Sequence, residues 1–165
     1  MILSVGELNE NKNHESVIRA IAGLNLTYVI VGKGELKEKL ESTAKECGVD
    51  LRLMGFCTNV SDFYDAADVY ILPSIREGLN VSLMEAMASG LPVACGKIRG
   101  NTDLIDHPLF DPLNIKEIKE AITTAIENKD DLGQKNLKKI RSFDLKTVEN
   151  ITSQIFMGGG VSAVD

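Results

Sequence analysis

Cysteine is scarce in this sequence, and its pattern excludes two ways of stabilising a fold. The 165 residues include three cysteines, Cys47, Cys57 and Cys95, and no CxxC pair. A disulfide framework or a structural zinc site needs more cysteines at closer spacing. We therefore expect neither, and a reducing cytoplasm fits this composition.

Long hydrophobic runs and a surplus of basic residues are missing too. No apolar run approaches the ~20 residues that a membrane-spanning helix needs, and no basic segment followed by a hydrophobic one opens the sequence. The formal net charge of -6 would repel nucleic acid and anionic membranes. The sequence predicts a cytoplasmic protein with no nucleic-acid partner. If the protein lies at the inner face of the membrane, a further domain would hold it there.

Several motifs of nucleotide and metal chemistry are also absent. The sequence holds no Walker pattern GxxxxGK[ST], no complete dinucleotide fingerprint GxGxxG and no DxD pair. Two histidines, His14 and His107, are too few for a metal site. For His14, at a helix start, a solvated side chain is favoured over a polar contact of a binding site. We expect no metal and no other cofactor.

A regular alternation of strand and helix patterns is present. β-prone runs end in glycine or proline and alternate with segments whose apolar residues recur at helical spacing. The expected strands are residues 1–5, 26–31, 50–54, 69–72 and 91–95. The expected helices between them are residues 13–24, 35–47, 60–66 and 81–89. Near-continuous apolar strands between amphipathic helices predict a Rossmann-like, doubly wound α/β fold with a parallel sheet.

The last part of the chain is predicted to contain helices alone. Apolar residues at helical spacing predict one helix over about residues 115–126 and another over about residues 145–155. Residues 157–165 include three consecutive glycines and are expected to form a flexible tail. The predicted organisation is therefore one domain over residues 1–156, followed by this tail.

The loops at one edge of the predicted sheet form the candidate site, because ligands of open parallel sheets bind beyond the carboxyl ends of the strands. These loops are residues 6–12, 32–34, 55–56, 74–80 and 96–103. Gly32 and Gly34 follow a strand and precede a helix, where small residues let backbone N–H groups approach a phosphate. A simple glycine turn explains the same pattern equally well.

The segment 73–90 is the most informative part of the sequence. If a helix begins near Asn80, its free N–H groups form an anion site at the positive end of the helix dipole, which suits a diphosphate. Glu77 and Glu85 would flank this site, and carboxylates accept hydrogen bonds from sugar hydroxyls. The alternatives are a solvated loop carboxylate for Glu77 and, for Glu85, a capping box with the N–H of Ser82.

Lys12, in the loop after the first strand, places a positive charge at the same edge. Its ammonium could neutralise a phosphate leaving group as negative charge develops during a reaction. Most surface lysines have no such role, so the case for Lys12 depends on its place at the ligand-binding edge of the sheet.

Together these residues resemble the C-terminal domain of GT-B glycosyltransferases, and specifically the family 4 retaining enzymes. The mark of that family is a pair of glutamates separated by seven residues, which is the spacing of Glu77 and Glu85. The block PSIREGLNVSLMEAMASGLPV resembles the family block, and ILSVGELNENKN, VIVGKGEL, LMGF and ADVYILPS stand in the family's order. The resemblance covers roughly residues 1–127.

The resemblance implies transfer of a hexose from a nucleotide diphosphate sugar, with retention of configuration, in polysaccharide or glycoconjugate biosynthesis. Residues 1–156 would be the nucleotide-sugar-binding domain. Glu77 would contact the donor sugar and, with Lys12, take part in catalysis, while Glu85 would hold the ribose. Lys12 would pair with the diphosphate, and residues 100–103 would approach the sugar. The remaining donor-binding residues implied are Gly6, Gly32, Gly34 and Gly78, the phosphate-binding amides of Leu79, Asn80 and Val81, and Gly55 and Phe56 near the base.

Two departures from the family pattern raise separate questions. Many members have GRL after the first strand, whereas this sequence has a glutamate, Glu7, which would repel a diphosphate. Lys12, with Lys33 or Arg76, would then have to carry the phosphate charge, or Glu7 must point elsewhere. The sequence also begins at what resembles the first strand of the second GT-B domain.

From this second departure we expect the partner to be an N-terminal acceptor-binding domain, in cis or in trans, and this chain alone to be inactive. The rival hypothesis is a non-catalytic nucleotide-binding subunit of a split glycosyltransferase.

Overall fold

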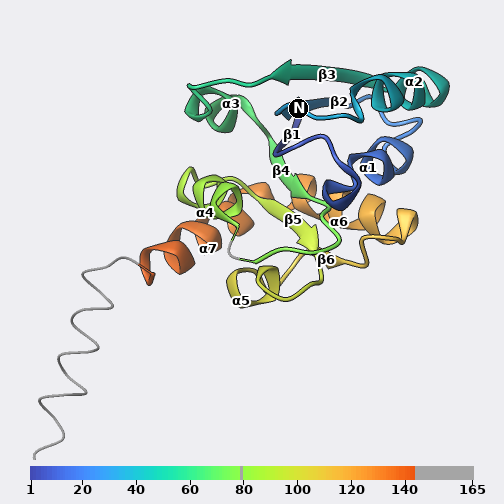
Figure 1. Ribbon diagram of the computed structural model, residues 1–165. Coiled ribbons are helices and arrows are strands. Elements are labelled where there is room, and N and C mark those ends of the chain that lie inside the picture. The colour runs from blue at the N-terminus through green and yellow to red at the C-terminus, as the bar shows by residue number, and fades with distance from the viewer. Residues whose placement is uncertain (79, 144–165) are drawn as a thin grey trace, which may run out of the picture.

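The computed structural model describes residues 1–78 and 80–143, which build a six-stranded sheet whose strand pairs are all parallel (Figure 1). The strand order is β3-β2-β1-β4-β5-β6. The strands are β1 (Ile2–Val5), β2 (Thr27–Val31), β3 (Asp50–Gly55), β4 (Val69–Leu72), β5 (Val93–Gly96) and β6 (Leu109–Phe110). The predicted doubly wound α/β fold is confirmed.

Helices cover both faces of the sheet. Ile2, Tyr28 and Ile71 pack with α1, α2 and α6 in one hydrophobic core cluster, while Leu3 and Tyr70 pack with α3 and α4 in a second. Burial on both faces explains why the strands are apolar without alternation. The helices are α1 (His14–Ala20), α2 (Lys37–Cys47), α3 (Ser61–Ala66), α4 (Val81–Ala88), α5 (Asn101–Leu104), α6 (Ile115–Glu127) and α7 (Lys129–Arg141), with a short 3-10 helix η1 (Glu10–Lys12).

The strand order reverses next to β1. Leu3 of β1 is in register with Val29 of β2 on one side and with Tyr70 of β4 on the other. The chain adds β2 and β3 outward on the first side and then returns to add β4, β5 and β6 on the second. The loops after β1 and β4 therefore leave the sheet side by side at a topological switch point, where α/β sheets bind ligands.

Three elements were not predicted: α5, β6 and α7. The contact face of α7 contains Leu132, Gly133 and Asn136 as its buried residues. A Cβ at Gly133 would lie 2.3 Å from the carbonyl oxygen of Gly90, and Asn136 Nδ2 donates to the carbonyl oxygen of Leu91 at 2.6 Å. This helix has few apolar residues, among them Leu132 and Ile140, and they stand among many charged ones, which explains the omission.

The predicted helix over residues 145–155 and the predicted tail over residues 157–165 lie outside the described residues. Between residues 114 and 143 the chain is helical, as expected. In the described ranges, no helix is both long enough and apolar enough to cross a bilayer.

Candidate functional site

The loops after β1 and β4 are joined by asparagine side chains. Asn11 Nδ2 donates to the carbonyl oxygen of Arg76 at 2.9 Å, and Asn11 Oδ1 accepts from the N–H of the same residue at 3.1 Å. Asn13 has left-handed backbone geometry, with φ 52°, and its Nδ2 donates to the carbonyl oxygens of Pro73 at 3.2 Å and Pro112 at 2.7 Å. These bonds hold Lys12, which lies between the two asparagines, against the loop that carries Glu77.

Lys12 and Glu77 form an ion pair across the switch point. Lys12 Nζ lies 2.6 Å from Glu77 Oε1, and the two side chains are only 18% and 12% exposed. A Cβ at Gly6 would lie 3.2 Å from Cε of Lys12, so the glycine leaves room for the lysine stem. The structure thus brings together three predicted site residues. Glu77 is not the freely solvated loop carboxylate of the alternative interpretation.

The ion pair sets the protonation state of Glu77. Burial alone would raise the pKa of Glu77, but the hydrogen bond from Lys12 and its positive charge hold that pKa below its ordinary value. The carboxylate is therefore ionised at neutral pH and acts only as a hydrogen-bond acceptor. A ligand with hydroxyl donors can bind Glu77, and an anionic group can compete with it for Lys12.

Glu7 makes a contact of its own, outside this pair. Its side chain is exposed, and Glu7 Oε2 accepts a hydrogen bond from Asn9 Nδ2 at 2.9 Å. Glu7 is thus paired with Asn9, while Lys12 is paired with Glu77.

Helix α4 begins at the switch point, and Asn80 is its N-cap, as expected. Asn80 Oδ1 accepts from the N–H of Leu83 at 3.0 Å. The N–H groups of Val81 and Ser82 donate to no described residue, so they and the positive end of the helix dipole offer an anion site. Leu79, also predicted to take part, lies outside the described residues.

Glu85, one turn further along α4, accepts a hydrogen bond from the hydroxyl of Tyr64 on α3 at 2.9 Å (Oε2). The alternative capping box with Ser82 is therefore wrong, because the carboxylate points to α3. Burial, and then the neighbouring Tyr70 and Glu85, raise the pKa of Tyr64, so this phenol stays protonated and acts as the donor. Glu85 itself is exposed and retains acceptor capacity for a ligand.

Gly32, Gly34 and Gly55 bring the loops after β1, β2 and β3 into backbone contact. A Cβ at Gly32 would lie 1.8 Å from the carbonyl oxygen of Gly6, and one at Gly34 would lie 2.3 Å from that of Leu8. Gly32 and Gly55 form an isolated bridge, and Gly55 has φ 71°. The loops fit together only because these positions lack side chains. The glycines thus have a packing role, and the approach of a phosphate to them stays a prediction.

The loop after β5 lies against the Glu77 loop. Gly100 has φ 92°, and a Cβ there would lie 2.3 Å from the carbonyl oxygen of Gly78. Among the described residues, nothing lies within 4 Å of a Cβ built on Gly78 itself. The expected approach of residues 100–103 to the site is thus compatible with the geometry.

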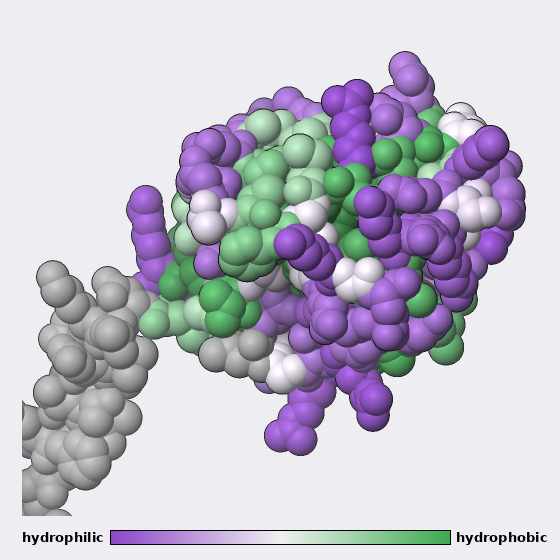
Figure 2. Space-filling view, turned by 45° about the horizontal axis from the view of Figure 1, so that its top comes forward, coloured by the Kyte–Doolittle hydropathy of each residue, from purple (hydrophilic) through white to green (hydrophobic). Residues whose placement is uncertain are grey.

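Several large apolar side chains are exposed at or near this edge. They include Met54, Phe56, Ile75 and Val81, and Phe56 is 73% exposed. Figure 2 shows hydrophobic residues gathered in the middle of one face of the molecule, bordered by hydrophilic ones. Exposed apolar surface of this kind suits a ligand ring or a covering protein surface.

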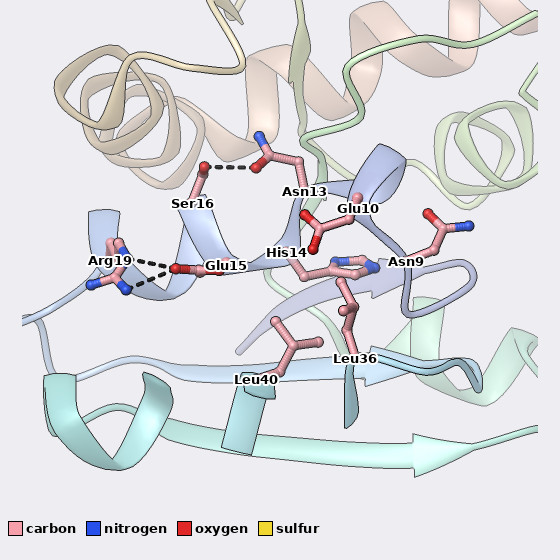
Figure 3. A pocket seen from close by; sticks show the side chains of 9 residues that line it. All are labelled: Asn9, Glu10, Asn13, His14, Glu15, Ser16, Arg19, Leu36 and Leu40. Carbon is pink, nitrogen blue, oxygen red and sulfur yellow. Dashed lines mark hydrogen bonds and ion pairs between the residues drawn. The ribbon is translucent and has the colours of Figure 1, made fainter. Parts of the chain in front are cut away.

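His14 is not solvated, so that expectation was wrong. Its side chain is 3% exposed and faces a small cavity lined also by Asn9, Glu10 and Leu36 (Figure 3). His14 Nδ1 lies 2.9 Å from the hydroxyl of Tyr28. Burial lowers the pKa of His14 to about 4, so the imidazole is neutral at physiological pH. It supports the segment that carries Lys12 from beneath.

Sequence reasoning missed Asn11, Asn13 and Tyr64 as members of the site. The run ENKN between a strand and a helix gave a usable signal for the first two, because asparagine tolerates left-handed geometry and bonds to nearby backbone. No sequence pattern relates Tyr64 to Glu85, since only the packing of α3 against α4 brings them together.

Comparisons with known proteins identify the family of the chain. A family model described as glycosyl transferases group 1 matches residues 1–142. An uncharacterized glycosyltransferase of Methanocaldococcus jannaschii is 34% identical over 115 residues, 65% of this chain and 30% of the relative. The amylovoran biosynthesis glycosyltransferase AmsK of Erwinia amylovora is 35% identical over 121 residues, 64% of this chain and 30% of the relative. The chain thus spans about 30% of the length of these curated relatives.

A solved structure shows the same fold. The crystal structure of Anabaena HepE in complex with UDP matches with a TM-score of 0.78 at 20% identity, over 92% of this chain and 48% of that one. At this identity the likeness establishes the architecture, a Rossmann-like α/β domain.

Proposed function

The chain belongs to the group 1 glycosyl transferases, and from this premise we propose that it is the donor-binding domain of a family 4 retaining enzyme. The domain binds a nucleotide diphosphate sugar, and the complete enzyme transfers the hexose in polysaccharide or glycoconjugate biosynthesis. The observation that carries the proposal is the free start of helix α4 at the switch point, with the Lys12–Glu77 pair on one side and Glu85 on the other.

The diphosphate binds at the start of α4. The N–H groups of Val81 and Ser82 donate to its oxygens, and the helix dipole favours its negative charge. Lys12 lies across the switch point and adds a full positive charge. During transfer, the bond between the sugar and the diphosphate breaks and the diphosphate leaves with the electron pair, so Lys12 and the helix start stabilise the charge that develops.

The two glutamates hold the two sugars of the donor. Glu77 is ionised and nearly buried, so it accepts hydrogen bonds from hydroxyls of the hexose and fixes its orientation. Glu85 is exposed, is oriented by Tyr64, and accepts from the ribose hydroxyls. The spacing of the glutamates and the family resemblance support a retaining reaction, and HepE supports a uridine nucleotide, since it was crystallised with UDP.

The acceptor is bound elsewhere. Because the chain spans about 30% of the length of its curated relatives, we assign acceptor binding to an N-terminal domain that meets this site in cis or in trans. The exposed apolar side chains near the site, such as Ile75 and Val81, would be covered in that arrangement.

Isothermal titration with UDP, GDP and ADP hexoses tests the proposal. We expect one of them to bind, and Glu85→Gln to weaken this binding about tenfold without changing stability, because a side chain that bonds the ribose loses an acceptor. Glu120→Gln, on the exposed surface of α6, is the matched control and should bind as the parent does. Failure of all nucleotides to bind would contradict donor binding.

A second measurement addresses the complete enzyme. Mixing the chain with a separately produced acceptor domain should restore hexose transfer if the two halves meet in trans. Binding of nucleotide without transfer would favour the non-catalytic subunit.

A further inference from the structure

A cavity beside the diphosphate site has a composition that selects among nucleobases. It has a volume of about 520 Å³ and lies beyond the carboxyl ends of β2 and β3. Leu8, Leu53 and Met54 give it apolar walls, and its glycines bring flat backbone close to the ligand space. This is the shape and polarity that suit an aromatic ring. The use of this cavity for a base rests on the function proposed above.

The side chains at the cavity offer hydrogen-bond donors and no acceptors. Lys33 and Lys37 are the polar side chains among its lining residues, and no carboxylate, amide or hydroxyl accompanies them. Cε of Lys33 lies 3.8 Å from a Cβ built on Gly55, so this lysine bends over the backbone of the cavity. Lys37 forms an ion pair with Glu41, with 3.9 Å between Nζ and Oε1. Lys33 makes no ion pair within residues 1–78 and 80–143.

Two backbone acceptors at the cavity are already engaged. The carbonyl oxygen of Lys33 accepts from the N–H of Leu8 at 2.9 Å, and the carbonyl oxygen of Leu8 accepts from the N–H of Leu36 at 3.0 Å. The isolated bridge of Gly32 with Gly55 engages the backbone there as well. An exocyclic amine of a base would find no side-chain acceptor among the lining residues, and a donor that loses its partner on binding weakens that binding.

We propose that Lys33 determines base specificity and selects uracil. Uracil presents two ring carbonyl oxygens and no exocyclic amine, so the ammonium of Lys33 donates to one of them, O4. Cytosine has the same ring size but carries an amine at that position, and adenine also carries an amine. Guanine has a suitable carbonyl but adds an amine at its far edge. The site discriminates between bases because Lys33 offers a hydrogen-bond donor, and a base with an amine at the facing position has no acceptor for it.

UDP and CDP are the decisive pair of probes, because they carry the same ribose and diphosphate and differ only in the pyrimidine edge. We expect the parent chain to bind UDP about tenfold more tightly than CDP. Lys33→Met keeps the apolar stem and removes the donor. It should weaken the binding of UDP about tenfold and change the affinity for CDP less than about twofold. Lys33→Arg restores a donor and should restore the preference. Lys116→Met, on the exposed surface of α6, should have no effect.

The outcomes separate this inference from the function on which it rests. If UDP and CDP bind equally, if GDP binds more tightly than UDP, or if Lys33→Met weakens UDP and CDP by the same factor, the specificity role is overturned while nucleotide binding stands. Equal weakening would mean that Lys33 acts only on the shared diphosphate. If the parent chain binds none of the nucleotides, the proposed function itself fails.

Discussion

The two halves of the ligand-binding edge are built in different ways. In the glycine half, formed by the loops after β1, β2 and β3, Gly32 and Gly34 place backbone directly against backbone. In the charged half, formed by the loops after β1, β4 and β5 together with the start of α4, side chains make the connections, above all Lys12 and Glu77. Lys12 and Gly6 belong to the loop that the two halves share.

This difference separates what must stay fixed from what can respond to a ligand. Backbone contacts in the glycine half leave no room for side chains, so we expect this half to be a rigid wall. The ion pair in the charged half can exchange partners, since an arriving diphosphate can take Lys12 and an arriving hydroxyl can take Glu77. The glycine half is thus the fixed side of the site, and the charged half is the side that can rearrange around a ligand.

A methyl group added on each side tests this contrast most directly. Gly32→Ala should lower the free energy of unfolding by about 3 kcal/mol or more, because its Cβ would overlap the carbonyl oxygen of Gly6 at 1.8 Å. Gly78→Ala in the charged half should change it by less than about 0.5 kcal/mol, since nothing lies within 4 Å of its Cβ. Urea denaturation measures both, and equal losses would remove the distinction between the halves.

His14 lies under the shared loop, and its hydrogen bond to Tyr28 reaches Ser4 and β4 beneath both halves. Its pKa is about 4 in the fold against 6.5 as the ordinary value. The neutral form is favoured by folding, so the stabilisation is complete above pH 6.5 and is lost as the pH falls toward 4. The parent should lose about 2 kcal/mol more than His14→Gln between pH 7 and pH 5. Parallel pH profiles of the two proteins would refute this.

The ion pair of the charged half should show strong coupling. Lys12→Met leaves Glu77 nearly buried without its partner and should cost about 1.5 kcal/mol, while the double variant with Glu77→Gln should cost less than the sum of the single variants. The pair Lys116 with Glu120 is the control. It is exposed at 85% and 63%, and its coupling should be below about 0.5 kcal/mol. Equal coupling energies in the two double-mutant cycles would mean that burial adds nothing.

Tyr64→Phe gives the smallest expected effect and probes the outer part of the charged half. The ring stays, but Glu85 loses the donor that orients it. We expect a loss of about 1 kcal/mol in the free energy of unfolding and nucleotide binding weakened about threefold. Titration of UDP into both proteins measures the second effect, and unchanged affinity would show that Glu85 needs no orientation by Tyr64.

The sequence predicts the strands of the sheet better than it predicts the helices in the last part of the chain. Strands such as β2 and β4 are apolar because both of their faces are buried, which makes them visible as hydrophobic runs. Helix α7 has few apolar residues among many charged ones, and it docks partly through Gly133 and Asn136. The two-residue strand β6 is too short for any pattern to mark it.

For the site, the sequence located the residues but could not give their environments. The loop positions of Lys12 and Glu77 followed from the strand pattern, whereas their direct contact depends on the strand order at the switch point. His14 was placed in solvent because a helix start is usually exposed, yet the loop above it and Leu36 beside it bury the imidazole. Burial of a polar side chain is decided by tertiary packing, which local sequence does not encode.

The hydrogen bonds between the loop after β1 and the loop after β4 make the site depend on the pairing of these two strands. Asn11 with Arg76 and Lys12 with Glu77 each join residues 65 positions apart, and Asn13 with Pro73 joins residues 60 apart. These contacts exist only when β4 lies beside β1, so the site depends on pairing between distant parts of the chain. A ligand held there would therefore stabilise the pairing of β1 with β4.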